Sequence, residues 1–151
     1  MKQSIPFMNR YMTVTGDDRA ITFCDLSDTD ETDGIAQGEL KKAVDQLKRY
    51  ASGEAIRFDI TLDPQGTSFQ KKVWAAMREI PYGQTKTYGD LARAIGSPKA
   101  FRAVGGACNR NPLTIVQPCH RVVGSDGSLT GFFGGLDLKA QLLEFEKRPR
   151  R

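Results

Sequence analysis

The chain has 151 residues, of which 39% are hydrophobic, and a formal net charge of +4. This length and composition predict a chain that buries a sizeable core. No apolar run approaches the roughly 18 residues of a membrane span, and the N-terminus lacks the long apolar stretch of a signal peptide. We therefore expect a soluble protein without a membrane partner, located in the cytoplasm, or in the nucleus of a eukaryote.

The first 62 residues predict a small α/β lobe with a structural role. Residues 11–14 and 20–24 are β-rich runs separated by a turn, which is typical of a hairpin. Residues 25–34 are charged and turn-prone, which predicts an exposed connection. Apolar residues recur at helical spacing over residues 36–50, and residues 55–62 alternate like a strand.

From residue 63 onward the pattern becomes helical. The segment 67–80 begins with a Thr/Ser cap and carries an apolar stripe that predicts a core-facing helix. In residues 85–112, Thr87 and Asp90 resemble a capping box, Gly96 suits a helix end, and Ser97 would cap a second helix with Pro98 at its first position. Two helices joined by so short a turn predict a helix-turn-helix, although a helical hairpin packed in a core gives the same pattern.

The sequence thus predicts an α/β N-terminal lobe over residues 1–62 and a mostly helical C-terminal domain over residues 63–151. The two parts differ in charge: the first carries 8 Lys/Arg against 11 Asp/Glu, and the second 14 against 7. Such a basic domain favours nucleic acid as a partner, with an ordinary solvated surface as the alternative. Two glycines in "RAVGGA", inside the second helix, indicate close approach by another backbone or by a ligand.

The chain holds three cysteines, Cys24, Cys108 and Cys119, and one histidine, His120. Three cysteines are a sparse and odd number for a secreted disulfide framework, and without CxxC or HxxxH spacing we predict no metal. Cys119 follows Pro118, which fixes the chain before it. A nucleophilic thiol needs an activating partner, and His120 is the only imidazole in the sequence. In an extended segment, however, the side chains of adjacent residues such as Cys119 and His120 point in opposite directions. Contact therefore requires a bridging water or a sharp turn at Pro118, and an inert buried cysteine is the alternative.

The motifs "RAVGGACNRNP" at 102–112, "PCHRVV" at 118–123 and "TGFFGGLDLKAQLLEFE" at 130–146 are collinear with those of the O6-alkylguanine-DNA alkyltransferases, and the chain resembles that family from about residue 67 to 147. The resemblance implies an enzyme for DNA repair by direct reversal. Its members move the alkyl group from O6-alkylguanine in duplex DNA irreversibly to their own cysteine, once per molecule, after flipping out the nucleotide. It implies no cofactor, because the alkylated cysteine is a stable thioether that is not regenerated. It leaves activity on O4-alkylthymine open, and we expect a monomer.

The resemblance also assigns residues. It implies Cys119 as the alkyl acceptor, His120 as the base that acts through a water, Glu146 as the group that orients His120, and Asn111 as a brace of the active-site turn. Tyr88 would turn the phosphodiester and assist the leaving guanine. For DNA binding it implies Arg102, which fills the vacated stack, with Tyr88, Ser97 and Ser125.

The expected substrate pocket comprises Val122, Phe132 and Phe133. Phe133 stands where the family frequently has a small residue, so we predict that it slows transfer of a bulky benzyl group and that Phe133→Ala changes this rate. Gln117 replaces an aliphatic residue and puts a polar group beside a buried turn. Two other readings compete: a non-catalytic alkyltransferase-like lesion binder, whose members lack the acceptor cysteine, and a cysteine hydrolase using Cys119 and His120.

Overall fold

A computed structural model describes residues 1–129 and 135–147, and these residues form two compact units. The first unit comprises residues 1–65 together with 112–116, and the second comprises residues 66–111 together with the described part of 117–147. Among the described residues no helix is long and apolar enough to cross a membrane. The same residues contain no group of three or more His, Cys, Asp or Glu side chains that could hold a metal ion.

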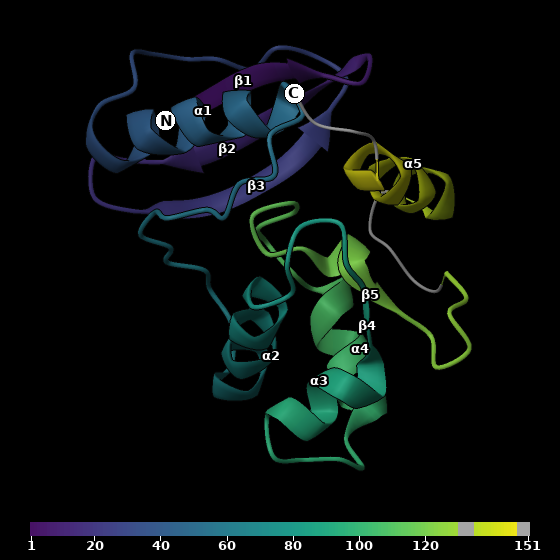
Figure 1. Cartoon of the computed structure of the whole chain (residues 1–151). Coiled ribbons are helices and arrows are strands. Elements are labelled where there is room, and N and C mark those ends of the chain that lie inside the picture. Colours follow the sequence, from purple (N-terminus) through teal and green to yellow (C-terminus); the bar gives the residue numbers. More distant parts are fainter. Residues whose placement is uncertain (130–134, 148–151) are drawn as a thin grey trace. The chain divides into compact units, whose positions relative to one another are not determined.

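The first unit is a three-stranded antiparallel sheet covered by one helix (Figure 1). Strands β1 (Lys2–Phe7), β2 (Arg10–Gly16) and β3 (Ile21–Ser27) pair in chain order, and α1 (Gly38–Ala51) packs on the sheet. The hairpin and the helix that the sequence predicted are confirmed. Apolar side chains of α1 meet those of the strands because they recur at helical spacing on one face; the buried ones are Leu40, Ala43, Val44, Leu47 and Tyr50.

The predicted strand over residues 55–62 is wrong. This segment makes only an isolated bridge to Ile21, whose N–H donates to the carbonyl of Thr61 at 2.9 Å. Three residues further along β3, Cys24 pairs instead with the segment 112–116, donating to Pro112 and accepting from Thr114, each at 2.9 Å. Because the edge of β3 is shared between two segments, neither can extend a ladder along it.

The second unit contains four helices and a two-stranded parallel sheet within the described residues: α2 (Ser68–Arg78), α3 (Tyr88–Ala94), α4 (Phe101–Asn109), α5 (Leu136–Lys147), β4 (Lys86–Thr87) and β5 (Val122–Val123). Capping boxes begin α2 at Thr67 and α3 at Thr87, as the sequence predicted for Thr87. Trp74 of α2 is buried and donates to the carbonyl of Ala107 in α4 at 2.8 Å. This bond fixes α2 against α4.

The predicted start of the second helix at Ser97 and Pro98 is wrong. Helix α3 ends with Gly96 at φ +77°, and the Ser97 N–H donates back to the carbonyl of Ala92 at 2.9 Å. Ser97 therefore completes the C-terminal cap of α3 instead of capping α4. Helix α4 begins at Phe101, and its N-cap residue, Ala100, makes no side-chain capping bond.

The β-branched run over residues 113–116, before Pro118, is buried and forms a turn. Ile115 is almost fully buried and adopts φ +75°, a conformation that β-branched residues rarely take. A short 3₁₀ helix, η1 (Cys119–Arg121), follows Pro118. The chain thus turns twice close to the cysteine and enters no sheet there before β5.

Candidate active site

Cys119 and His120 lie in the tight turn η1, so the sharp turn at Pro118 that their contact requires is present. The Cys119 N–H donates to the carbonyl of Gln117 at 2.8 Å, and the Arg121 N–H donates to that of Pro118 at 2.9 Å. The exposed fraction is 7% for Cys119 and 0% for His120. Since the backbone bonds hold both residues, neither side chain depends on a mobile loop for its position.

A buried carboxylate fixes the imidazole. His120 Nε2 lies 2.7 Å from Glu146 Oε2, in the last turn of α5. An ionised carboxylate only accepts, so Nε2 carries the proton and Nδ1 keeps its lone pair. Nδ1 is buried and has no hydrogen-bond partner among the described residues. Burial lowers the pKa of His120, against the opposing hydrogen bond to Glu146. The resting imidazole is therefore neutral at pH 7, with a free basic nitrogen.

Arg121 completes a buried charge cluster that sequence reasoning missed. Its Nε and Nη2 donate to the two oxygens of Glu146 at 2.8 and 3.0 Å, and its Nη1 donates to the carbonyl of Ile80 at 2.9 Å. The Gly83 N–H also approaches Glu146, at 3.3 Å. Burial alone would raise the pKa of Glu146, but the hydrogen bond from His120 and the ion pair with Arg121 hold this pKa well below its usual range. Glu146 is therefore an anion throughout the physiological pH range.

Asn111 is hydrogen-bonded to the segment just before Pro118. Its side-chain amide donates to the carbonyl of Gln117 at 2.7 Å, while the Gln117 side chain donates back to Asn111 Oδ1 at 2.7 Å. The Gln117 side-chain oxygen accepts from Arg78. The polar group that the sequence placed beside a buried turn is thus fully buried and hydrogen-bonded through both ends of its amide.

The thiol of Cys119 lies near a second buried charge, Lys139. Burial raises the pKa of Cys119, while a hydrogen bond from Asn111 and the charge of Lys139 act in the opposite direction. Lys139 is fully buried on α5, and its ammonium lies 6.0 Å from the ring centroid of Tyr88. Sequence reasoning missed this lysine; the available signal was its spacing of seven residues from Glu146, which places both on one helix face.

Tyr88 and Cys108 pack beside the same thiol. Tyr88 begins α3, is half-buried, and packs against the apolar cluster that contains Cys108 and Cys119. Burial raises the pKa of Cys108 to about 12, and its sulfur lies 3.6 Å from the sulfur of Met77. Cys108 is therefore a core thiol that stays protonated at neutral pH.

The expected DNA-binding residues lie on three segments. Arg102 is exposed on α4, Ser97 is half-buried in the connection between α3 and α4, and Ser125 is exposed in the turn after β5. Of the expected pocket residues, Val122 is fully buried in β5. Phe132 and Phe133 lie outside the described residues.

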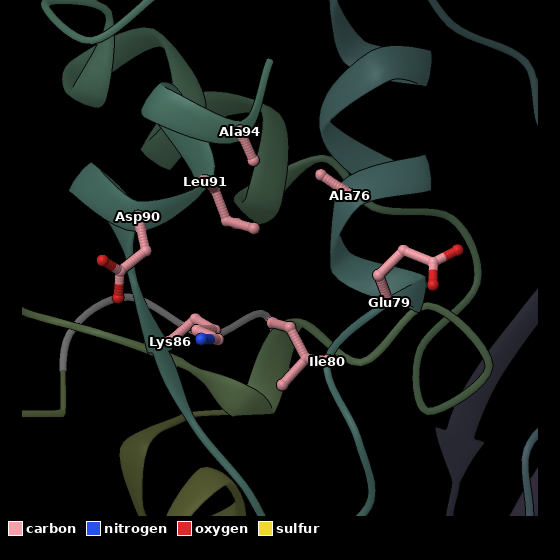
Figure 2. A pocket seen from close by; sticks show the side chains of 7 residues that line it. All are labelled: Ala76, Glu79, Ile80, Lys86, Asp90, Leu91 and Ala94. Carbon is pink, nitrogen blue, oxygen red and sulfur yellow. The ribbon is translucent and has the colours of Figure 1, made fainter. Parts of the chain in front are cut away.

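An open hollow of about 270 Å³ in the second unit lies between α2 and α3. Its lining residues are Ala76, Glu79, Ile80, Lys86, Asp90, Leu91 and Ala94. Figure 2 shows the small and aliphatic side chains turned toward its centre and the carboxylates of Glu79 and Asp90 turned away from it. It contains neither Cys119 nor a convergent set of polar groups, so the thiol cluster is the better candidate for chemistry.

The comparisons with known proteins agree on one family. Residues 68–148 match the family model described as 6-O-methylguanine DNA methyltransferase, DNA binding domain. A methylated-DNA–protein-cysteine methyltransferase of Methanosarcina acetivorans is 57% identical over 106 residues, which cover 70% of this chain and 68% of the relative. The corresponding protein of Mycobacterium tuberculosis is 53% identical over 110 residues, which cover 73% and 67%.

Solved structures extend the similarity to the N-terminal part. The crystal structure of Mycobacterium tuberculosis OGT in complex with DNA matches with a TM-score of 0.84 and 42% identity, over 97% of this chain and 92% of that one. Since the family model spans more than half of the chain and relatives above 50% identity cover most of it, the chain belongs to the 6-O-methylguanine DNA methyltransferase family and is an enzyme of the methylated-DNA–protein-cysteine methyltransferase class.

Proposed function

We propose that the chain repairs DNA by transferring the alkyl group of O6-alkylguanine in a duplex to Cys119, irreversibly and once per molecule. The observation that carries this proposal is the buried cluster of Cys119, His120 and Glu146, in which the neutral imidazole has one nitrogen bound to a carboxylate and the other available as a base. This arrangement suits activation of an adjacent thiol.

In the proposed reaction the Cys119 thiol loses its proton to His120 Nδ1 through a water, and Glu146 stabilises the resulting imidazolium. The thiolate sulfur forms a bond to the alkyl carbon while the bond from that carbon to O6 breaks, and its electron pair stays on guanine. The Tyr88 hydroxyl donates a hydrogen bond to the departing base. The product thioether has no carbonyl for water to attack, so the enzyme is not regenerated.

DNA binding in this proposal uses α3 and α4 as a helix-turn-helix with α4 against the minor groove. Arg102 is exposed on α4, where it can enter the base stack as the damaged nucleotide flips out. Ser97 and Ser125 would contact the backbone, and phosphate contacts by the basic surface would supply affinity with little sequence preference. In this scheme residues 1–62 have a structural role, and the protein acts as a monomer.

The test is the intact mass of the protein after incubation with a duplex that contains one O6-methylguanine. We expect wild type to gain one methyl group that maps to Cys119, Cys119→Ser to gain none, and Cys24→Ser, altered in the other unit, to gain one. An unchanged wild-type mass despite tight lesion binding would instead favour the non-catalytic lesion binder. Continuous release of product from an ester or peptide would favour the hydrolase. A duplex with O4-methylthymine tests the second substrate.

A further inference from the structure

Phe101 is an aromatic side chain that the packing of the second unit leaves in solvent. It is the first residue of α4 and is 52% exposed, whereas Val104, Ala107 and Cys108 of the same helix are buried. Full burial of a large apolar side chain stabilises by about 1.5–3 kcal/mol. Because the fold uses only part of this contribution, the exposed half of the ring is available to a partner that approaches the start of α4.

The helix surface one turn beyond Phe101 carries no side chains. Residues four positions apart lie on the same helix face, so Phe101 is followed by Gly105 and Arg102 by Gly106. A Cβ added at Gly106 would meet nothing within 4 Å among the described residues, and one at Gly105 would meet the Tyr88 ring only at 3.9 Å. The core therefore does not require either glycine. Phe101 and Arg102 project beside a bare backbone surface that a groove can approach closely.

The charge around Phe101 identifies the kind of partner. From Leu91 to Ser125 the sequence contains no Asp or Glu and five basic residues: Arg93, Lys99, Arg102, Arg110 and Arg121. The first four are exposed. Arg93 is paired with Asp90 and Arg121 is neutralised in the buried cluster, so Lys99, Arg102 and Arg110 carry the exposed positive charge around Phe101. A protein interface is depleted of charge at its centre, whereas a nucleic acid requires a basic surface.

We propose that Phe101 is a second DNA-inserting side chain, which enters the minor groove of duplex DNA and stacks on a base step beside the nucleotide displaced by Arg102. This inference rests on the proposed function, because it places α4 against the duplex. Proteins that bend DNA from the minor groove insert apolar wedges such as phenylalanine between base steps. The ring recovers stacking that the displaced nucleotide loses, so its contribution is greatest where a base is already unstacked.

The test is binding of a fluorescein-labelled duplex with one O6-methylguanine, measured by anisotropy in the Cys119→Ser background, which prevents transfer. Since stacking of one base on an aromatic side chain is worth about 1–3 kcal/mol, we expect Phe101→Ala to raise Kd by about 5- to 150-fold. Phe101→Trp, which keeps an aromatic face, should stay close to wild type. Phe23→Ala is the matched control: Phe23 is 41% exposed on β3, and its loss should leave Kd unchanged.

The salt dependence separates stacking from phosphate contact. Phe101→Ala should lower affinity at every salt concentration without changing the slope of log K against log salt, whereas Arg110→Ala should reduce this slope by about 1. An unchanged Kd for Phe101→Ala, or a changed slope, would overturn the proposal. So would a shift in sedimentation mass at unaltered DNA affinity, because Phe101 would then serve a second copy of the chain.

A reaction without DNA distinguishes this inference from the proposed function. With O6-benzylguanine as a free base and Cys119 intact, Cys119 of the Phe101→Ala variant should be benzylated at the wild-type rate, because no duplex takes part. A slower rate would place Phe101 in the reaction itself and overturn its role as a DNA wedge. If wild type transfers no alkyl group from DNA yet Phe101→Ala still weakens duplex binding, the alkyl-transfer function fails and the DNA wedge stands.

Discussion

Replacing Glu146 by glutamine removes the one negative charge from a cluster in which Arg121 is the buried cation. The exposed fraction of the side chain is 1% for Glu146 and 8% for Arg121, and two of the Arg121 nitrogens donate to the carboxylate at 2.8 and 3.0 Å. Breaking a buried pair by removing one partner costs about 3–5 kcal/mol. Two hydrogen bonds to a charged group, at about 1.5–3 kcal/mol each, give a comparable sum.

This loss is a large share of the stability of an ordinary domain, which is about 5–15 kcal/mol. At a urea m-value near 2 kcal/mol per molar, a loss of about 4 kcal/mol lowers the unfolding midpoint by about 2 M. Trp74, the chain's only tryptophan, is buried in the second unit and reports the transition by fluorescence. Glu144→Gln, on the exposed side of α5, is the matched control and should stay within about 0.5 kcal/mol.

Adding Arg121→Met to Glu146→Gln should recover part of the loss, because the second substitution removes the stranded cation. Alkyl transfer should remain slow in both variants, by about 10²-fold or more, since His120 loses the anion that stabilises its charged form. A midpoint for Glu146→Gln within 0.5 M of wild type, about 1 kcal/mol at that slope, would refute the assigned charge pairing.

Two further predictions concern the buried titratable groups. Lys139→Met removes a cation that favours the Cys119 thiolate, so the pH midpoint for alkylation of Cys119 by iodoacetamide should rise. In Lys139→Arg, which keeps the charge, this midpoint should rise less. An unchanged midpoint in Lys139→Met would exclude electrostatic coupling between the two groups. The groups that act on this thiol are Lys139 from α5, Cys108 from α4 and Asn111 after α4, and Tyr88 from α3 packs on the same cluster. Burial lowers the folded pKa of His120, so below the unfolded value of about 6.5 the unfolded chain binds a proton that the folded chain does not. The free energy of unfolding should then fall by up to about 1.4 kcal/mol per pH unit as the pH drops from 6.5. Urea unfolding between pH 7.5 and 5.5 measures this dependence, and His120→Asn should abolish it.

Local signals predicted the elements whose ends are set by neighbouring residues. The capping boxes at Thr67 and Thr87 lie within four consecutive residues each, so the starts of α2 and α3 were accessible to inspection. Strand β1 was missed because its turn to β2 uses Met8 and Asn9 at positive φ, which lacks the usual Asn-Gly signature. The false strand at 55–62 depended on competition for one sheet edge, which is a tertiary property.

The candidate site divides in the same way. Cys119 and His120 were accessible because they are adjacent and chemically distinctive, whereas Glu146 is 26 residues away and entered only through the family resemblance. Arg121 gave no signal and Lys139 only its spacing from Glu146, since basic residues in a turn and on a helix normally face solvent. Their burial follows from the packing of α5 against η1, which sequence spacing alone does not reveal.

The placement of Lys139 and Glu146 on α5 explains how two neutral groups can react together. Burial disfavours the charged form of both the Cys119 thiol and the His120 imidazole, so proton transfer between them creates two charges in a poorly solvated site. The charge of Lys139 favours the thiolate, and in the proposed reaction Glu146 stabilises the imidazolium. One face of α5 thus supplies a positive charge for the thiolate and a negative charge for the imidazolium. Neither Cys119 nor His120 has to be ionised before the proton is transferred.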